Sequence, residues 1–137
     1  MILVVDTNVL VSALLNPGRT PDLCLAAVRA RTEVRVVVDA RVEAEYREVL
    51  ARPKFRKVEP DRREALLGAL LDIAHRVEGA AVSTLTLRDE GDRIFVDLCL
   101  AARADAVITG NARHYPTDLG FAVLSPAALL TRLDGPP

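Results

Sequence analysis

Asp6 has the residue type and the position to do chemistry. It ends an apolar run, Met1-Ile2-Leu3-Val4-Val5, and begins Asp6-Thr7-Asn8-Val9. A continuous apolar run of this kind indicates a strand buried on both faces. Open α/β sheets place their ligand sites at the carboxyl ends of strands. A charge at a buried strand end needs a partner. The sequence shows no structural partner, so we expect Asp6 to serve a ligand.

Glu45 is the second candidate acid. It lies on a predicted helix over 40–51, where it shares a stripe with Val42 and Val49. This spacing would turn its carboxylate toward the sheet. The helix carries two further glutamates, however, and several glutamates on one helix are also typical of a solvated face.

Two more acids and an amide follow later in the chain. Asp92 begins a predicted helix over 92–103, where an acid also favours the helix dipole without any ligand. Asp97 lies five residues on, about 140° around that helix, so it cannot share the direction of Asp92. Asn111 follows a predicted strand over 106–109, and therefore also lies at the carboxyl end of a strand.

Carboxylates gathered at one sheet edge repel one another, and each raises the pKa of its neighbours unless a cation neutralises them. Oxygen ligands suit Mg²⁺ or Mn²⁺ rather than zinc. Such an ion can orient a water as nucleophile and offset charge on a phosphodiester transition state. The sequence contains no GxSxG, GxxxxGK[ST] or GxGxxG motif and no evident Cys/His pair that would favour another chemistry.

Alternating strands and helices must position these residues. We expect strands at 2–6, 34–38, 80–83, 106–109 and 121–124, and helices at 8–15, 21–31, 40–51, 60–77, 92–103 and 126–133. This order predicts an α/β fold, a three-layer α/β/α sandwich with a central parallel sheet of Rossmann-like type. We expect a single domain over 1–134 and a short tail over 135–137.

Composition limits how the chain could contact a polyanion. The net charge is −1 and only 4% of residues are aromatic, so neither a global basic field nor stacking platforms are expected. A local basic cluster follows the Glu45 helix, and Arg62 and Arg63 continue it. It could track phosphates or be an ordinary solvated loop. Its members are Arg52, Lys54, Arg56 and Lys57.

Cys24 and Cys99 both sit among aliphatic residues, which indicates buried, reduced thiols rather than a zinc site or a disulfide framework. No signal peptide is visible, because Asp6 interrupts the first apolar run, and no stretch reaches the ~20 apolar residues of a membrane span. We therefore expect a soluble, cytoplasmic protein without a membrane partner.

Three spaced motifs resemble those of PIN domains, the nuclease fold of VapC-type toxins. The opening Asp6-Thr7-Asn8-Val9-Leu10 is similar to the first PIN motif. The stretch from Glu45 to Phe55 resembles the second-acid segment of one PIN branch, the putative toxin-antitoxin toxins. The last segment resembles the one that carries the third and fourth PIN positions, and it reads Asp92-Arg93-Ile94-Phe95-Val96-Asp97, then Ala104-Asp105-Ala106-Val107-Ile108-Thr109-Gly110-Asn111.

The resemblance implies a ribonuclease that depends on Mg²⁺ or Mn²⁺ and cleaves RNA. It also implies a cognate antitoxin as partner, and it leaves open whether the protein forms a homodimer. Asp6, Glu45 and Asp92 match the three acids used around the metal. The fourth position is Asn111, which brings no charge, and Asp97 is the acid that could supply it. Polar residues at matching positions would orient the acids or contact substrate. They are Thr7, Asn8 and Thr109.

Two other functions remain open at this point. A degenerate PIN fold would bind RNA or a protein without cutting, and Asn111 keeps that alternative alive. A phosphatase of the haloacid dehalogenase type also has an Asp after its first strand. That class needs a second Asp two residues on, where this chain has Asn8, and a lysine on the sheet edge. The only lysines here, Lys54 and Lys57, lie in the basic cluster.

Overall fold

The computed structural model describes residues 1–135. Its strands are β1 (Ile2–Val5), β2 (Arg35–Val38), β3 (His75–Arg76), β4 (Ala106–Ile108) and β5 (Ala122–Leu124). Its helices are α1 (Thr7–Leu15), α2 (Thr20–Ala30), α3 (Ala40–Leu50), α4 (Pro60–Ile73), α5 (Arg93–Ala102) and α6 (Pro126–Asp134). Three short 3₁₀ turns complete the elements, namely η1 (Pro53–Phe55), η2 (Glu90–Asp92) and η3 (Ala112–His114).

The strands form one parallel sheet in the order β3-β2-β1-β4-β5. The chain first builds outward from β1 through β2 to β3, and then returns to place β4 on the other side of β1. The strand order therefore reverses between β1 and β4. In open α/β sheets this reversal opens a crevice outside the carboxyl ends of the strands, where ligands bind. Asp6 follows β1 and Thr109 follows β4, so both lie at this point.

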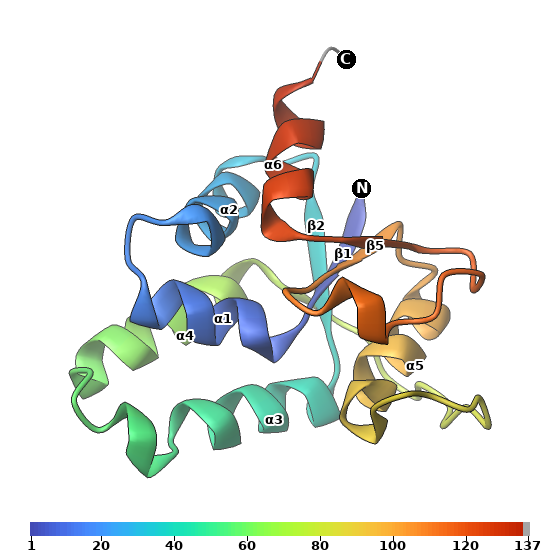
Figure 1. The fold of residues 1–137 in the computed structure, drawn as a ribbon, viewed down its shortest axis with the longest axis horizontal. Helices are drawn as coiled ribbons and strands as arrows, with labels where there is room; N and C mark the ends of the chain where they lie inside the picture. Colours follow the sequence, from blue (N-terminus) through green and yellow to red (C-terminus); the bar gives the residue numbers. More distant parts are fainter. Residues whose placement is uncertain (136–137) are drawn as a thin grey trace.

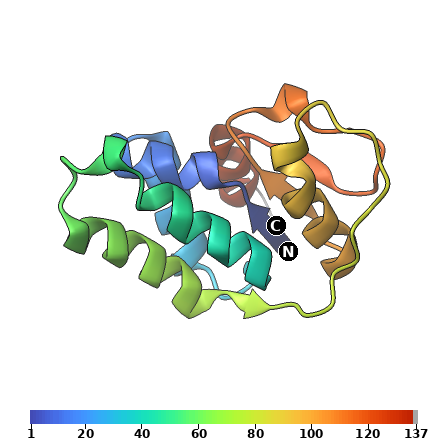
Figure 2. The same ribbon diagram turned by 90° about the horizontal axis from the view of Figure 1, so that it is seen from below.

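Helices cover both faces of the sheet, which confirms the predicted α/β/α arrangement. On one face, α5 packs against β1, β2 and β4. On the other, α1, α2, α4 and α6 pack together, and Figures 1 and 2 show the sheet between the two groups. Helix α3 crosses the carboxyl end of the sheet and contacts α1, α4 and α5. It therefore carries its side chains past the ends of β1 and β2.

Local signals explain where most elements begin. The Asp39 carboxylate caps α3 by accepting from the Val42 N–H at 2.9 Å, and Ser125 caps α6 by accepting from the Ala128 N–H at 3.0 Å. The valine and leucine runs of β1, β2 and β4 are almost wholly buried, as expected for strands covered on both faces. Cys24 and Cys99 are buried free thiols, which confirms that prediction. Burial raises the pKa of Cys99 to about 12, so its thiol is inert.

The third strand is not where the sequence predicted it. The helix expected over 60–77 ends at Ile73, and β3 is His75–Arg76 rather than 80–83. Ala74 is already extended, and His75 and Arg76 pair with Val37 and Val38 of β2. The apolar pattern of the sequence extends to Val77, which made the helix appear longer. Ala74 and Val77 do pack against the core, but they do so from extended backbone. Residues 80–83 belong to an irregular segment.

That irregular segment is fastened to α3 and α5 by side chains. Arg93 donates to the Ser83 carbonyl at 2.7 Å and to the Leu85 carbonyl at 2.6 Å. Arg41 reaches the Ala80 carbonyl at 3.4 Å. Most of the predicted tail, residues 136–137, lies outside the described residues. No helix within residues 1–135 has the length and apolar character needed to cross a membrane.

Candidate active site

The Asp6 carboxylate is held by three donors. Its Oδ1 accepts from the Asn8 N–H at 3.2 Å, which also makes Asp6 the N-cap of α1. Its Oδ2 accepts from the Thr109 hydroxyl at 2.9 Å and from the Tyr115 hydroxyl at 2.8 Å. The expectation that Asp6 has no structural partner is therefore wrong. The donors to Oδ2 come from the loop after β4, more than 100 residues away. Thr109 is expected from the sequence to orient the acids, whereas Tyr115 is not anticipated.

Glu45 points toward the start of α1. Its side chain is half-buried, and its Oε2 accepts from the Thr7 hydroxyl at 2.6 Å. Helix α3 turns this residue inward because Val42, one turn earlier on the same side, is fully buried against the core. The prediction that Glu45 turns toward the sheet holds, whereas Glu48, the next glutamate on the helix, is exposed and pairs with Arg52.

Asp92 carries an unsatisfied oxygen. It is the last residue of η2 and precedes α5, but its side chain makes no capping hydrogen bond. Its Oδ2 is buried and has no hydrogen-bond partner among the described residues. Burial, together with the charges of Asp6, Asp89 and Glu45, raises the pKa of Asp92 to about 7. Burial is the larger cause of this shift, and the negative charges of Asp6 and Glu45 add to it.

These acids do not form a closed cage for an ion. Within residues 1–135, no group of three or more His, Cys, Asp or Glu side chains is arranged so that it could hold a metal ion by itself. Asp92 nevertheless has one buried carboxylate oxygen without a hydrogen-bond partner among the described residues. Mg²⁺ usually takes only one or two carboxylates and retains several waters, which needs no three-sided cage.

Polar residues fasten the loops around Asp6. Asn8 links both sides, because its Nδ2 donates to the Thr109 hydroxyl at 3.2 Å and its Oδ1 accepts from the Gly110 N–H at 3.0 Å. The Thr109 hydroxyl also accepts from the Asn111 N–H at 3.0 Å. The Asn111 side chain itself is exposed and makes no hydrogen bond within residues 1–135. Asn8 therefore joins the start of α1 to the loop after β4.

Asp97 has different neighbours from those of the other acids. Its carboxylate is fully buried, accepts from the Ser83 N–H at 3.2 Å and lies 3.8 Å from the Arg41 guanidinium. Arg41 also pairs with Asp39 at 3.2 Å. Asp97 therefore helps to fasten the irregular segment, and Arg41 offsets its charge. Its catalytic role stays a prediction.

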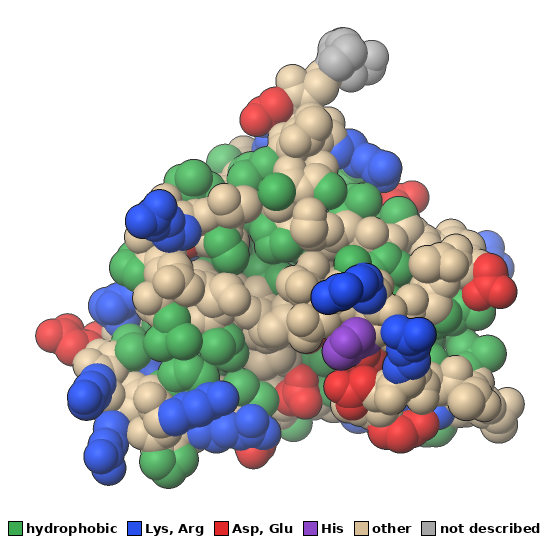
Figure 3. All heavy atoms as spheres, in the orientation of Figure 1, with side chains coloured by type: hydrophobic (Ala, Val, Ile, Leu, Met, Phe, Trp, Pro, Cys, Tyr) green, Lys and Arg blue, Asp and Glu red, His purple; other side chains and the backbone are tan. Residues whose placement is uncertain are grey.

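The basic cluster lies at the far end of α3 from the three acids. Arg52 pairs with Glu48 at 3.1 Å, and Lys54 lies 5.1 Å from the centre of the Phe55 ring. An open hollow of about 350 Å³ lies here. It is lined by Pro53 and by three residues of the cluster, Lys54, Arg56 and Lys57. Figure 3 shows Lys and Arg side chains gathered at that end of α3, whereas acidic side chains lie between α3 and α5.

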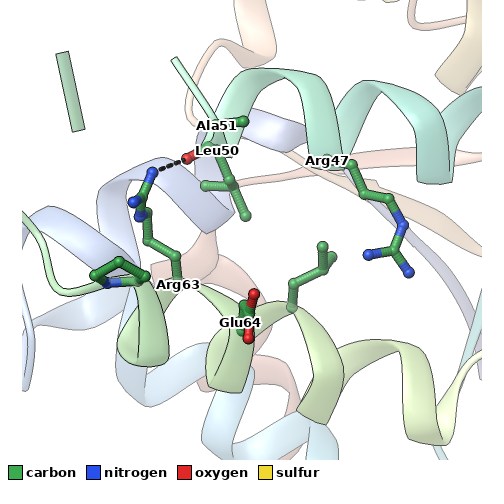
Figure 4. A pocket seen from close by; sticks show the side chains of 7 residues that line it. Arg47, Leu50, Ala51, Arg63 and Glu64 are labelled. Atoms are coloured by element: carbon green, nitrogen blue, oxygen red, sulfur yellow. Dashed lines mark hydrogen bonds between the residues drawn. The ribbon is translucent and has the colours of Figure 1, made fainter. Parts of the chain in front are cut away.

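Arg62 and Arg63 do not continue the basic cluster as expected. Arg62 donates to the Leu14 carbonyl at the end of α1 at 2.9 Å. Arg63 donates to the Leu50 carbonyl at the end of α3 at 3.0 Å, as Figure 4 shows. Both guanidinium groups thus satisfy carbonyls that helix ends leave without partners. Figure 4 also shows the hollow of about 280 Å³ between α3 and α4 that Arg63 borders.

Comparison with known proteins agrees with this architecture. VapBC2 from Rickettsia felis, bound to a DNA fragment from its promoter, contains a chain similar in fold. The TM-score is 0.59 at 14% sequence identity, over 91% of this chain and 98% of that one. No curated protein matches the sequence.

The family model described as PIN domain matches residues 2–113, a span that includes Asp6, Glu45, Asp92 and Asn111. PIN domains are generally nucleases. Because the match spans well over half of the sequence, the chain belongs to the PIN-domain family.

Proposed function

We propose that this protein is a divalent-metal-dependent endoribonuclease and the toxin of a type II toxin-antitoxin pair. The observation that carries the nuclease proposal is the buried, unpartnered Oδ2 of Asp92 beside the charges of Asp6 and Glu45. A divalent cation would neutralise these carboxylates, which supports a metal site here. Family membership supports phosphodiester cleavage over other metal chemistry.

The donor set fits Mg²⁺ or Mn²⁺. Asp6, Glu45 and Asp92 offer only carboxylate oxygens. Hard divalent cations prefer such oxygens, whereas zinc favours nitrogen and sulfur ligands. The three acids would hold the ion, with water completing its coordination. When bound, it would orient a water as nucleophile and offset negative charge on the scissile phosphate.

The chain's own residues prepare this site. Thr7 fixes the Glu45 carboxylate, and Thr109 and Tyr115 fix that of Asp6. Asn8 ties the start of α1 to the loop after β4, so that the acids following different strands keep their separation. Holding catalytic groups in place before substrate binds lowers the reorganisation needed during reaction. We assign Thr7, Asn8 and Thr109 this orienting role.

Substrate binding would use the basic cluster at the end of α3. Arg56 and Lys57 are exposed, make no ion pair within residues 1–135, and border an open hollow with Lys54. Lys and Arg side chains bind the phosphates of nucleic acids without reading their sequence. The cluster and the acids are separated along α3, which would let one RNA strand span both.

A cognate antitoxin is the second part of the proposal. The similar R. felis chain comes from a toxin-antitoxin complex bound to promoter DNA. Its fold covers nearly the whole of this chain. We therefore propose that this protein is also controlled by a small partner encoded beside it, and that it acts in the cytoplasm. Whether it forms a homodimer is open to a measurement of its mass in solution.

The decisive experiment is cleavage of a labelled single-stranded RNA by the purified protein, with Mn²⁺ or Mg²⁺ and with a chelator. We expect cleavage only with the ion, and loss of cleavage in Asp92→Asn. Asp118→Asn is the matched control, because Asp118 is an exposed aspartate outside the site. Cleavage by Asp92→Asn at the wild-type rate would contradict the proposal.

One alternative rests on Asn111. This residue takes the place of a fourth acid, is exposed, and adds no negative charge for a cation. A PIN fold with weakened metal binding would bind RNA without cutting it. Binding of the same RNA by a protein that never cleaves it, at any Mn²⁺ concentration, would favour this alternative.

A further inference from the structure

Tyr115 contacts Asp6, although no sequence motif selects it. It follows η3, outside the region matched by the family model, and its side chain is 4% exposed. Its hydroxyl donates to Oδ2 of Asp6 at 2.8 Å. The Thr109 hydroxyl donates to the same oxygen at 2.9 Å. Two hydroxyl groups therefore converge on one carboxylate oxygen.

The two oxygens of Asp6 are consequently unequal. A carboxylate has about four lone-pair positions, two on each oxygen. Thr109 and Tyr115 occupy both positions on Oδ2. On Oδ1, the Asn8 N–H occupies one position, at the longer distance of 3.2 Å. Asp6 thus retains a single free position, on Oδ1, for any further ligand.

We propose that Tyr115 is a specificity-determining residue: with Thr109 it restricts Asp6 to one-oxygen ligation and so makes the site select Mg²⁺ or Mn²⁺ over Ca²⁺. Mg²⁺ demands six ligands in near-ideal octahedral geometry, which single carboxylate oxygens and waters satisfy. Ca²⁺ takes six to eight ligands and often both oxygens of one carboxylate. Blocking Oδ2 removes that second oxygen. This inference rests on the metal site of the proposed function.

Tyr115 is a positioning residue in this scheme, since it acts on the ion through Asp6 and touches neither ion nor substrate. A purely structural role would have another signature. If the tyrosine only fastened the loop after η3, its loss would weaken the binding of every cation alike. The ratio of Ca²⁺ to Mn²⁺ affinity separates the two roles, because only freeing Oδ2 changes one affinity relative to the other.

The test is a calorimetric titration of the purified protein with Mn²⁺ and with Ca²⁺, for the wild type and Tyr115→Phe. Phenylalanine keeps the ring and removes only the hydroxyl. We expect the affinity for Ca²⁺ relative to Mn²⁺ to rise by about tenfold, the effect of one charge-assisted hydrogen bond. Tyr46→Phe is the matched control, because the buried Tyr46 hydroxyl donates to the Val5 carbonyl at the same sheet edge and not to Asp6. Its affinity ratio should equal that of the wild type.

Three outcomes are informative. A shifted ratio in Tyr115→Phe but not in Tyr46→Phe supports the inference. An unchanged ratio, in variants that still bind Mn²⁺, overturns it and leaves the metal site standing. A wild type that binds neither ion refutes the proposed metal site itself. If Tyr115→Phe does not fold by circular dichroism, Thr109→Val frees the other lone pair of Oδ2 and should shift the ratio in the same direction.

Discussion

Asp6 and Asp92 lie at one edge of the sheet, but their oxygens meet different surroundings. Asp6 caps α1 and accepts from two buried hydroxyl groups. Asp6→Ala should abolish cleavage and also lower the free energy of unfolding by about 2 kcal/mol, from a lost helix cap and hydroxyl donors left without an acceptor. Urea denaturation beside Asp118→Ala, an exposed control, measures this effect. An unchanged midpoint for Asp6→Ala would mean that water replaces the carboxylate at no cost.

Replacing Asp92 should have the opposite effect on the free energy of unfolding. Its folded-state pKa of about 7 lies above the ordinary value of 3.8, so its charged form is disfavoured in the folded protein at higher pH. Asp92→Asn should therefore raise the free energy of unfolding of the metal-free protein above about pH 7, by about 1 kcal/mol once solvent screening is allowed for. Denaturation with a chelator tests this. A destabilised variant would show that the carboxylate has a stabilising partner.

Asn111 is an exposed, uncharged residue at the position where the family resemblance expects a fourth acid. An added carboxylate strengthens the attraction for a divalent cation, so Asn111→Asp should lower the Mn²⁺ concentration needed for half-maximal cleavage. We expect a shift of about tenfold, which corresponds to about 1.4 kcal/mol. The side chain is exposed, so the fold should tolerate the change. If the Mn²⁺ concentration needed for half-maximal cleavage is unchanged or rises, Asp97 or water already fills this position.

At the scale of elements, one ion pair joins α3 to the edge strand β3. Both oxygens of Glu43 accept from Arg76, at 2.7 and 2.9 Å. The Arg76 guanidinium lowers the pKa of Glu43 from 4.5 to about 2. A lowered folded-state pKa stabilises the protein above the ordinary pKa, and that contribution is lost as pH falls from 4.5 toward 2.

Glu43→Gln should therefore flatten the decline of unfolding free energy across that acidic window. The measurement is the difference between wild-type and variant stability as a function of pH. Glu64→Gln, an exposed glutamate on α4, should keep the wild-type slope. Equal slopes for wild type and Glu43→Gln would show that the pair with Arg76 does not persist in solution.

Elements with strong local signals could be predicted, and those fixed by distant contacts could not. The buried valines of β2 and the Asp39 cap of α3 lie within a few residues of the structure that they specify. Strand β3 has only two residues and exists through pairing with β2. Tyr115 could not be predicted for the same reason, because its hydrogen bond to Asp6 spans 109 positions of the sequence. Sequence motifs could select Asp6 and also Thr109, one of the two hydroxyl donors to it, but not Tyr115, the other donor.

At the scale of the whole molecule, many charges are paired locally, but the basic cluster after α3 stands out. The net charge is only −1, yet Lys and Arg gather beyond the end of α3 while acids lie between α3 and α5. In the proposed function, the basic cluster would hold the phosphates of a polyanion that is cut beside the acids. The cut site would need its cation before the phosphate could approach, because bare carboxylates repel it.

Replacing Lys54 and Arg56 with Ala should weaken the binding of unrelated RNAs by similar factors. Each lost phosphate contact should also reduce the slope of log affinity against log salt by about one unit or slightly less. Binding is best measured in an Asp6→Asn background, which separates it from cleavage. Arg29→Ala with Arg132→Ala is the matched control, since both arginines are exposed on α2 and α6, away from η1. It removes the same charge from another part of the surface. If the control lowers the slope as much as the η1 variant does, the RNA responds to total charge and the cluster is an ordinary solvated loop.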